Sequence, residues 1–595
     1  MADLRYLKYR IPGVALLAGG IALGGESAAS AFHFLHPALG GWFNPLDGLG
    51  WLSKMNGQCI IEPRLIEFRN GIEHIRTALP PCHIHPATVA AINARSVPWF
   101  ASGAIAWGGF LLAEQASRVK GVRGRVFPRT QKDLGYIRIG RSTGKLRALG
   151  HAAGIRGGQD ICLSGNDLYQ HVLGLGGIGS GKSSSFMNPA VRQIMEQGWG
   201  AFIVAVKEDL VAQCSWIAAK AGVVIRHIGV GGQPTNLMDG LPPERASAYF
   251  SSVMLLGDSS RDSKFWNTTA TNYARAALGI LYYFPAHYSL PDLYRYTFVP
   301  AFREDIDAQV DALEVQRAVE LSAATDPQLI AAIETDIRTI ANCKQEIANH
   351  DDLTPEIKRS VTTQLSSALS GMIAPEIEDA FFATGAPALD LESTYKKGAI
   401  FTIHAGNNGL SSTGVLAFAK QRFFDVMTAR RALTGEDRER PVAFVGDEYA
   451  SIATCPDDGR GDQDFFATCR DTKTSCILAC QSISGLIAKV GDDMAKAVLA
   501  SMRTRLIFRT EDQDTIKTTL DLLGQVEVER ESESSTRNPG QWGKSRGTST
   551  QTVFQPVAHA ELFRNLEPFE AVVIASIGNR SCDDVVKCAP EFLSA

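Results

Sequence analysis

The chain has 595 residues, of which 45% are hydrophobic and 21% are charged. This length is too great for one hydrophobic core and predicts roughly three to four domain-sized units. The composition excludes a disordered protein and a membrane transporter with many spans. The net charge of −4 excludes a uniformly basic nucleic-acid coat, although a local basic channel remains compatible with it. The 11 cysteines are too sparse for a disulfide scaffold and indicate a reduced, cytosolic body.

Two apolar segments near the N-terminus are expected to span a membrane. Residues 96–113 form an uncharged apolar run close to one bilayer crossing, and we place the span at about 96–116. Residues 11–25 form a weaker run, which must extend to about residue 32 (a span of 11–32) to cross fully. A cleaved signal peptide is the alternative interpretation of this first run. The second span favours a retained two-helix transmembrane hairpin.

Basic residues orient this hairpin, which we assign to a membrane domain of residues 1–125. Four of them lie between Arg118 and Arg125, directly after the second run, so the positive-inside rule places the body of the chain in the cytoplasm. The segment of about 33–95 would then be extracytoplasmic. It contains Cys59 and Cys82, and the sequence alone does not establish that they pair.

Changes in composition divide the cytoplasmic part. From about residue 135 to 235 glycine is frequent and short Val/Ile-rich runs alternate with helical patterns, which indicates βαβ units in a first core segment of residues 126–235. No glycine occurs between Gly279 and Gly371, and apolar residues recur there at helical spacing. We therefore predict an all-α domain over 236–392. The alternating pattern returns over 393–595, so the predicted fold is an α/β core with an all-α insertion.

A glycine-rich segment carries the first chemical signal. Residues 176–183 read GGIGSGKS and fit G-x-x-x-x-G-K-[ST], between an expected strand at 171–175 and an expected helix. Glycines let consecutive N–H groups face phosphate oxygens, and the helix N-terminus adds a positive dipole. Lys182 would contact the β- and γ-phosphates, and the Ser183 hydroxyl would ligate Mg²⁺. The expected phosphate-binding residues are Gly176, Gly177, Ile178, Gly179, Ser180, Gly181, Lys182, Ser183 and Ser184.

A dinucleotide fingerprint competes for the same glycines. Residues 174–179 also match G-x-G-x-x-G, but that motif leaves Gly181 to Ser183 unexplained. It also expects an acidic residue about 20 positions further on, at the end of the next strand. The next expected strand, 201–206, is followed by Lys207 instead. The phosphate loop of a nucleoside triphosphatase is therefore the preferred interpretation.

Two further strands end in polar residues that suit a nucleotide site. The apolar run in residues 441–450 ends in Asp447 and Glu448. Asp447 would bind the nucleotide's Mg²⁺ and Glu448 would polarise the attacking water. Gly446 is an irregularity, since an apolar residue is usual before the acid. The strand expected within residues 475–482 ends at Gln481, which would sense the γ-phosphate or would simply be a polar residue at a strand end.

The order of these features resembles a known family. The chain contains two apolar spans, GGIGSGKS, a helical insertion, the Asp-Glu strand, CQS, RTRLIFRT (503–510) and GQVEVERESES (524–534). In this order they resemble the coupling proteins of type IV secretion systems, the TraD/TraG family of conjugative ATPases. Further likenesses are AVKEDL (205–210), Phe265-Trp266 and NLEP (565–568), and the departures are Ala205, Glu208 and Gly446.

The resemblance implies a membrane-anchored homo-hexamer of RecA-like P-loop domains around a pore. ATP hydrolysis with Mg²⁺ at the subunit interfaces would drive relaxase-bound single-stranded DNA toward the secretion channel. Relaxosome proteins and inner-membrane secretion components would be partners, and the body would be cytoplasmic at the inner membrane of a bacterium. Arg470 matches the family's region for an arginine finger supplied in trans. Arg503 and Arg505 are rivals that would otherwise form interface ion pairs.

DNA contact is harder to place. Residues 529–552 are polar and predict an exposed loop or hairpin. Its basic and aromatic residues would suit single-stranded DNA, or the segment would be solvated without a role. The candidates are Arg537, Trp542, Lys544 and Arg546. The histidines show no zinc-like spacing, and we interpret Cys469, Cys476 and Cys480 as packing residues.

Three other functions remain open at this stage. The same motor would export protein effectors if the helical insertion bound proteins rather than relaxosomes. A chromosome translocase of the FtsK/HerA type shares the core chemistry, but would be expected to lack this combination of hairpin and insertion. A non-enzymatic membrane scaffold would use nucleotide only to assemble.

Overall fold

The computed structural model describes residues 136–256, 263–406, 409–456, 461–536, 545–578 and 580–592. The chain divides into two compact units, 1–125 and 126–595, and all described residues belong to the second. The expected spans, the segment between them, Cys59 and Cys82 therefore lie outside the described residues. Within the described part, no helix combines the length and the apolar character needed to cross a bilayer.

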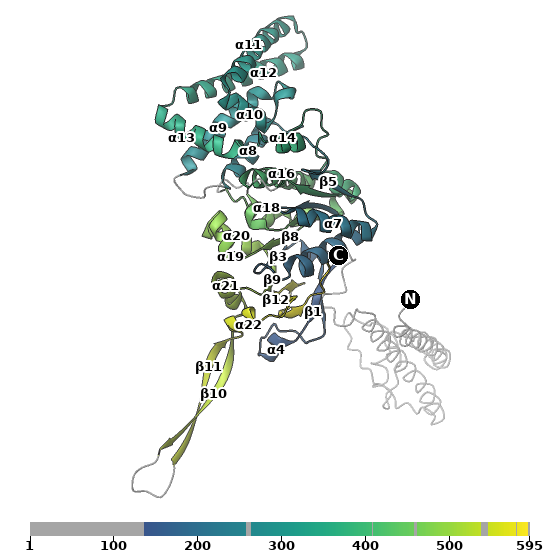
Figure 1. The fold of residues 1–595 in the computed structure, drawn as a ribbon, viewed down its shortest axis with the longest axis vertical. Helices are drawn as coiled ribbons and strands as arrows, with labels where there is room; N and C mark the ends of the chain where they lie inside the picture. The colour runs from purple at the N-terminus through teal and green to yellow at the C-terminus, as the bar shows by residue number, and fades with distance from the viewer. Residues whose placement is uncertain are drawn as a thin grey trace, which may run out of the picture. The chain divides into compact units, whose positions relative to one another are not determined.

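An eleven-stranded sheet forms the centre of this unit, with the strand order β2-β1-β15-β12-β9-β3-β8-β7-β4-β6-β5 (Figure 1). Neighbouring strands are parallel from β9 to β5 and antiparallel from β2 to β9. The strands are β1 (Tyr136–Ser142), β2 (Asp160–Ser164), β3 (Val172–Leu175), β4 (Gly200–Val204), β5 (Ile225–Gly229), β6 (Ile400–His404), β7 (Val442–Gly446), β8 (Thr474–Cys480), β9 (Thr504–Phe508), β12 (Glu570–Ile574) and β15 (Asp584–Lys587). The predicted α/β class is confirmed.

The central strands are apolar throughout because both faces of the sheet are covered. In β4, Ala201 and Ile203 belong to one buried cluster, while Phe202 and Val204 belong to the other. The first cluster is covered by α6 and α7, and the second by α16 and α18 to α21. The helices of the core are α4 (Lys145–Ala148), α5 (Gly165–Leu168), η3 (Ser183–Met187), α6 (Asn188–Glu196), α7 (Glu208–Ala221), α15 (Ser393–Lys397), α16 (Leu410–Ala429), η5 (Arg430–Ala432), α17 (Glu436–Glu439), η6 (Tyr449–Ser451), α18 (Asp462–Thr468), η7 (Cys469–Thr472), α19 (Ile483–Val490), α20 (Asp492–Ser501), α21 (Gln513–Leu523) and α22 (Ala560–Arg564).

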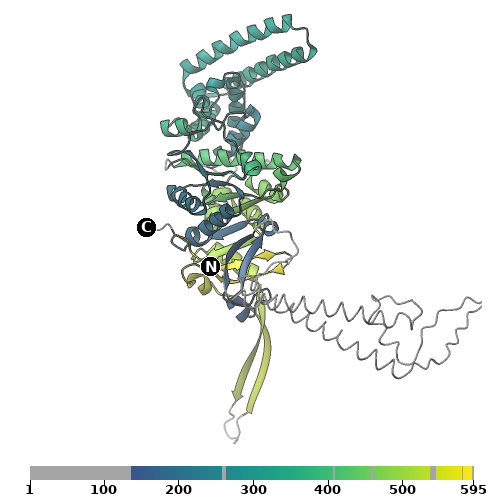
Figure 2. The same ribbon diagram turned by 90° about the vertical axis from the view of Figure 1, so that its right-hand side faces the viewer.

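Between β5 and β6 the described elements are helices, and α8 packs on α16 of the core. These helices are α8 (Pro243–Met254), α9 (Ser263–Leu281), η4 (Pro285–His287), α10 (Leu290–Phe298), α11 (Pro300–Ala323), α12 (Pro327–Asp351), α13 (Pro355–Leu369) and α14 (Pro375–Phe381). Several begin with proline, whose fixed φ and missing N–H suit a first helical position. Figure 2 shows α11 and α12 running side by side at the far end of this part.

A two-stranded ribbon, β10 (Gln525–Thr536) with β11 (Ser545–Pro556), extends from the core (Figures 1 and 2). The hairpin predicted over 529–552 is therefore present. Arg546 lies opposite Ser535 in its register. The other DNA candidates, Arg537, Trp542 and Lys544, lie outside the described residues. A shorter pair, β13 (Ser576–Ile577) with β14 (Arg580–Ser581), forms a separate two-stranded sheet.

Core packing predicts the effect of one aromatic truncation. The fully buried Phe202 ring stacks on Phe423 with centroids 5.0 Å apart. Phe202→Ala should lower the free energy of unfolding by about 3–5 kcal/mol, because it leaves a cavity in a close-packed layer. Chemical denaturation measures this loss. Phe554→Ala is the matched control, since this ring is 66% exposed and its loss should cost under about 0.5 kcal/mol. Equal losses in the two variants would contradict the described core.

Candidate functional site

The glycine-rich loop lies at the carboxyl end of β3 and leads directly into η3 and α6. The Gly177 N–H donates to the Arg509 carbonyl at 3.0 Å, which fixes the loop to the segment after β9. The turn Ser183–Met187 is a π-helix, a wider turn that often occurs at functional sites. The loop therefore leads directly into the N-terminus of a helix, the position at which proteins bind phosphate groups.

Close packing explains why glycines occupy this loop. A Cβ at Gly176 would lie 2.7 Å from the Phe508 Cβ, and Gly181 has a φ of 90°, which disfavours other residues. The Ser180 Oγ is buried and has no hydrogen-bond partner among the described residues. A buried hydroxyl without a partner is costly, so a ligand oxygen at this position would satisfy it. The loop therefore fits a phosphate group.

Lys182 lies against the same loop. Its ammonium donates to the carbonyl oxygens of Gly176 and Gly177, the second at 3.0 Å. Burial lowers the pKa of Lys182, and the nearby Asp447 carboxylate offsets part of this shift. Phosphate oxygens would compete with the two carbonyls for this ammonium, because they carry a negative charge and the carbonyl oxygens do not.

The acidic pair follows β7 at the same edge of the sheet, because β7 pairs with β8 and β8 pairs with β3 in parallel. Burial raises the pKa of the Asp447 carboxyl, and the charge of Glu448 raises it further. Glu448 has a φ of 53°, a left-handed conformation that is rare outside glycine. Backbone strain of this kind often marks a functional position.

The Glu448 carboxylate has two partners from neighbouring strand ends. Its Oε1 forms an ion pair with the Lys207 ammonium, and the Gln481 Nε2 lies 3.5 Å from the same oxygen. Lys207 follows β4 and its side chain is largely exposed. An exposed ion pair of this type is worth little, so Glu448 can leave it at small cost.

A cavity of about 190 Å³ lies between these elements. It brings together most of the predicted residues, namely Ile178, Gly179, Lys182, Ser183, Asp447, Glu448 and Gln481. It also contains Lys207 and Gln213, to which the sequence analysis assigned no role. The Gln213 Oε1 is buried without a hydrogen-bond partner among the described residues. The sequence feature that could have identified Lys207 as a site residue is its position after an expected parallel strand, where side chains of adjacent strands converge.

The three candidate arginines differ in the contacts that their side chains make. Arg470, in η7, does not line the cavity; its side chain is exposed and contacts no described residue by hydrogen bond or ion pair. Arg505 donates to the carbonyls of Met502 (3.2 Å) and Leu499 (2.5 Å), at the end of α20. Arg505 is therefore occupied within its own chain, as a helix cap and not as an ion-pair partner. Arg503 reaches the Ser576 hydroxyl at 3.4 Å.

Comparisons with known proteins agree with this geometry. Residues 441–568 match the family model described as the TraM recognition site of TraD and TraG. This segment begins at β7 and includes both Asp447 and Gln481. The resemblance to the TraD/TraG coupling proteins inferred from the sequence is thereby confirmed. No curated protein matches the chain by sequence.

Solved structures of the bacterial conjugative coupling protein TrwB share the fold. The unbound monoclinic form of TrwBdeltaN70 has a TM-score of 0.51 and 17% identity, covering 78% of this chain and 94% of that chain. TrwB with the ATP analogue ADPNP also has a TM-score of 0.51 and 17% identity, over 78% and 96%. TrwB with ADP and Mg²⁺ has a TM-score of 0.50 and 16% identity, over 77% and 95%. At these identities the likeness establishes the fold alone.

The buried Asp447 carboxyl is expected to lower the stability of the folded protein in exchange for ligand binding. Because burial raises the Asp447 pKa, the ionised carboxylate is disfavoured in the folded protein. Asp447→Asn should therefore raise the free energy of unfolding by about 0.5–2 kcal/mol at pH 8. The gain should shrink as the pH falls through the raised pKa of Asp447 in the folded protein, and it should vanish well below about pH 4, where the wild-type acid is protonated in both states. Denaturant titrations across this pH range measure it.

The matched control for this substitution is Asp209→Asn, which removes an exposed acid from the same cavity. This variant should change stability by less than about 0.5 kcal/mol. A stability loss in Asp447→Asn at pH 8 would contradict the assigned cost of its charge. Asp447→Asn should also lose Mg²⁺-dependent nucleotide binding, which calorimetry measures.

Proposed function

We propose that this protein is a type IV coupling protein, because residues 441–568 match the family model of TraD and TraG and the chain has the TrwB fold. In this role it is an ATP-driven motor with a RecA-like P-loop core. It recruits relaxase-bound single-stranded DNA and passes it to a secretion channel during conjugation. No observation on the described residues favours effector export, chromosome translocation or a passive scaffold.

One observation carries the proposal. Lys182 with Ser183, and Asp447 with Glu448, meet in a single cavity although the two pairs are far apart in sequence. A cation, a hydroxyl and two carboxylates at the carboxyl ends of parallel strands are the parts that phosphoryl transfer needs. A passive scaffold needs no catalytic base beside the phosphate loop. The arrangement therefore supports hydrolysis as well as binding.

Nucleotide binding would use the loop and the residues around it. The Lys182 ammonium and the N–H groups of residues 176–184 would hold the β- and γ-phosphates, apart from the N–H groups of Gly177 and Ser180, which donate to carbonyls of the chain. The Ser183 hydroxyl and the Asp447 carboxylate would hold Mg²⁺, whose preferred ligands are oxygens. When bound, this ion neutralises the charge that develops on the transferring phosphoryl group. The complex of TrwB with the non-hydrolysable ATP analogue ADPNP is consistent with this assignment.

Hydrolysis would begin when Glu448 leaves the Lys207 ammonium and accepts a proton from the attacking water. Gln481, already 3.5 Å from Glu448, would help to orient that water on the γ-phosphate side. The bond from the γ-phosphorus to the bridging oxygen breaks, and ADP and phosphate leave. Arg470 of a neighbouring subunit would stabilise the charge on the γ-phosphate, since it is exposed and unengaged.

We infer the assembly, the location and the partners of the motor from the resemblance to the TraD/TraG family. A homo-hexamer would place Arg470 of one subunit beside the cavity of the next. The apolar segments 11–32 and 96–116 would anchor the hexamer in the bacterial inner membrane, with its body in the cytoplasm. Relaxosome proteins are the proposed partners, since the matching family model describes recognition of TraM. Inner-membrane components of the secretion system would receive the DNA.

The motor predicts ATP hydrolysis that responds to DNA. Purified full-length protein should hydrolyse ATP faster with single-stranded DNA, and the stimulation should fade as salt rises, because phosphate contacts release counterions. Lys182→Ala should lose at least about 100-fold in rate, since it removes charge stabilisation of the transferring phosphoryl group. A colorimetric phosphate assay measures both.

Each alternative predicts a different result in this assay. Hydrolysis without DNA stimulation, by folded and oligomeric protein, would favour the export of protein effectors. An unchanged rate in Lys182→Ala, together with normal DNA transfer between cells, would favour a scaffold and contradict the motor.

The placement of Arg470 predicts complementation between two inactive proteins. Arg470→Ala should lower kcat by about 10³-fold or more if the guanidinium acts in trans. Mixed oligomers of Arg470→Ala and Lys182→Ala subunits should recover activity, because an intact cavity then meets an intact arginine. Phosphate release by the mixture measures this. Arg503→Ala, an alternative exposed arginine, is the matched control, and activity no greater than the sum of the separate proteins would contradict action in trans.

A further inference from the structure

The segment that carries Arg470 is held at its beginning by a fully buried polar cluster. Asp462 starts α18, and both of its carboxylate oxygens lie 2.6 Å from the Lys420 ammonium of α16. The Thr454 N–H also donates to this carboxylate at 3.1 Å, and the Gln421 amide at 3.0 Å. Burying such a pair costs so much that it persists only with excellent geometry, and it is weak evidence for stability. A role in specifying geometry is therefore the better explanation.

The Asp462 carboxylate also links α18 to the turn after β7 that contains Glu448, the catalytic turn. The Tyr449 hydroxyl donates to the Asp462 Oδ2 at 2.7 Å, and Tyr449 directly follows Glu448 in the chain. Burial raises the pKa of Tyr449 well above its ordinary value, so the hydroxyl keeps its proton and remains a donor. Glu448 is already held in a left-handed backbone conformation. This hydrogen bond therefore links the turn directly to the start of α18.

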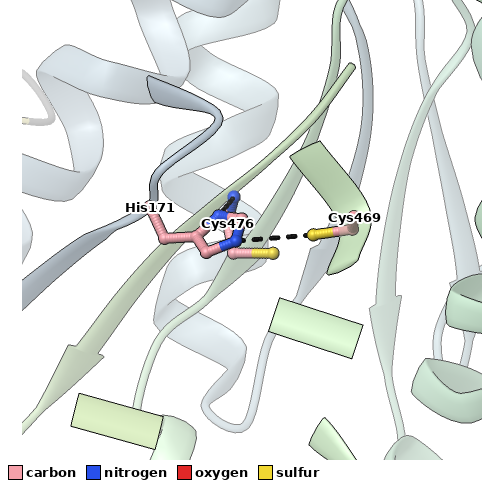
Figure 3. A group of neighbouring side chains, drawn as sticks. All are labelled: His171, Cys469 and Cys476. Atoms are coloured by element: carbon pink, nitrogen blue, oxygen red, sulfur yellow. Dashed lines mark hydrogen bonds between the residues drawn. The ribbon is translucent and has the colours of Figure 1, made fainter. Parts of the chain in front are cut away.

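A second buried cluster holds the other end of the segment (Figure 3). His171, immediately before β3, places its Nε2 at 2.9 Å from the Phe466 carbonyl of α18. Its Nδ1 accepts from the Cys476 N–H at 3.1 Å, and the Cys469 thiol lies 3.4 Å from Nε2. The accepting Nδ1 fixes the proton on Nε2, which therefore donates to the carbonyl. Since β3 leads to the phosphate loop, this cluster ties the loop's strand to η7.

This second cluster is not a metal site. The three possible ligand atoms, from His171, Cys469 and Cys476, lie within 4.8 Å of one another. A histidine bound to metal through one nitrogen donates a hydrogen bond from the other nitrogen. Nε2 does not suit a metal, because Nδ1 would then have to donate and it faces an N–H donor; Nδ1 does not suit one either, because the Cys476 N–H already occupies its lone pair. The cluster serves as a hydrogen-bonded anchor.

We propose that α18 and η7 form a rigid arm, anchored by Asp462 to the catalytic turn and by His171 to the strand of the phosphate loop, that positions Arg470. Movement at the nucleotide site of one subunit is then transmitted to the guanidinium that serves the next subunit. Tyr449, Asp462, Lys420 and His171 are positioning residues in this arm. The proposal rests on the function proposed above, because it needs Arg470 to act in trans.

The hydroxyl of Tyr449 offers the mildest test. In full-length protein, Tyr449→Phe removes one hydrogen bond to a charged group and keeps the ring. We expect kcat for ATP hydrolysis with single-stranded DNA to fall about tenfold. KM for ATP should stay within about twofold, because the phosphate loop and Asp447 are untouched. Tyr288→Phe is the matched control, since its hydroxyl is also buried and donates to the Leu241 carbonyl at 2.8 Å, away from the site.

A double-mutant cycle with Arg470→Ala separates transmission from general damage. If Tyr449 acts through Arg470, Tyr449→Phe should add little to the loss already caused by Arg470→Ala. If its role is merely structural, the two fold-losses should multiply. His171→Asn tests the other anchor, since asparagine tolerates the left-handed backbone at residue 171 (φ 65°). It should show the same dependence on Arg470, and it replaces Tyr449→Phe in the cycle should that variant not fold.

The outcomes distinguish the arm from the motor. A normal rate in Tyr449→Phe, or multiplied losses in the cycle, would overturn the arm while leaving the motor intact. An unchanged rate in Arg470→Ala, with loss in Lys182→Ala, would overturn both action in trans and the arm. No hydrolysis by the wild-type protein would overturn the proposed function itself.

Discussion

The structure depends first on the parallel pairing of β3, β8 and β7. The pairing places Leu175 beside Cys480 and Gly446 beside Leu478, so the loop after β3, Gln481 and Asp447 emerge at one edge. Parallel strands need crossover connections, and these connections are the helices that bury both faces of the sheet. The same pairing therefore builds the hydrophobic core and assembles the cavity.

Charge burial is the cost of this arrangement. Lys182 and Asp447 each have a pKa shifted toward the neutral form by burial, and in the proposed function each would have to be charged to bind phosphate or Mg²⁺. Glu448 carries backbone strain in addition. These penalties are local, and the apolar layers on both faces of the sheet offset them. The Lys420–Asp462 pair differs, because its partners satisfy the carboxylate almost completely without any ligand.

Local patterns predicted much of the site, and long-range contacts explain what they missed. The loop of residues 176–183 and the Asp447-Glu448 pair are short motifs whose function depends on neighbouring residues. The Gly446 irregularity has a packing reason, since a Cβ there would lie 3.3 Å from the Leu478 side chain. Lys207 carries no such local signature. Its partner Glu448 is 241 residues away, and only the parallel pairing of β4 with β7 brings the two together.

The sequence by itself determined the apolar strands that end at the cavity and the glycine-rich loop of residues 176–183, and it predicted which residues would bear the phosphate and metal chemistry. Those properties depend on periodicity and on motifs a few residues long, so they survive without knowledge of the fold. Only the tertiary structure decided that Arg505 caps α20, that His171 supports η7 and that Lys420 meets Asp462. Each of these contacts joins side chains whose meeting is set by strand order and helix packing, and no local pattern encodes either.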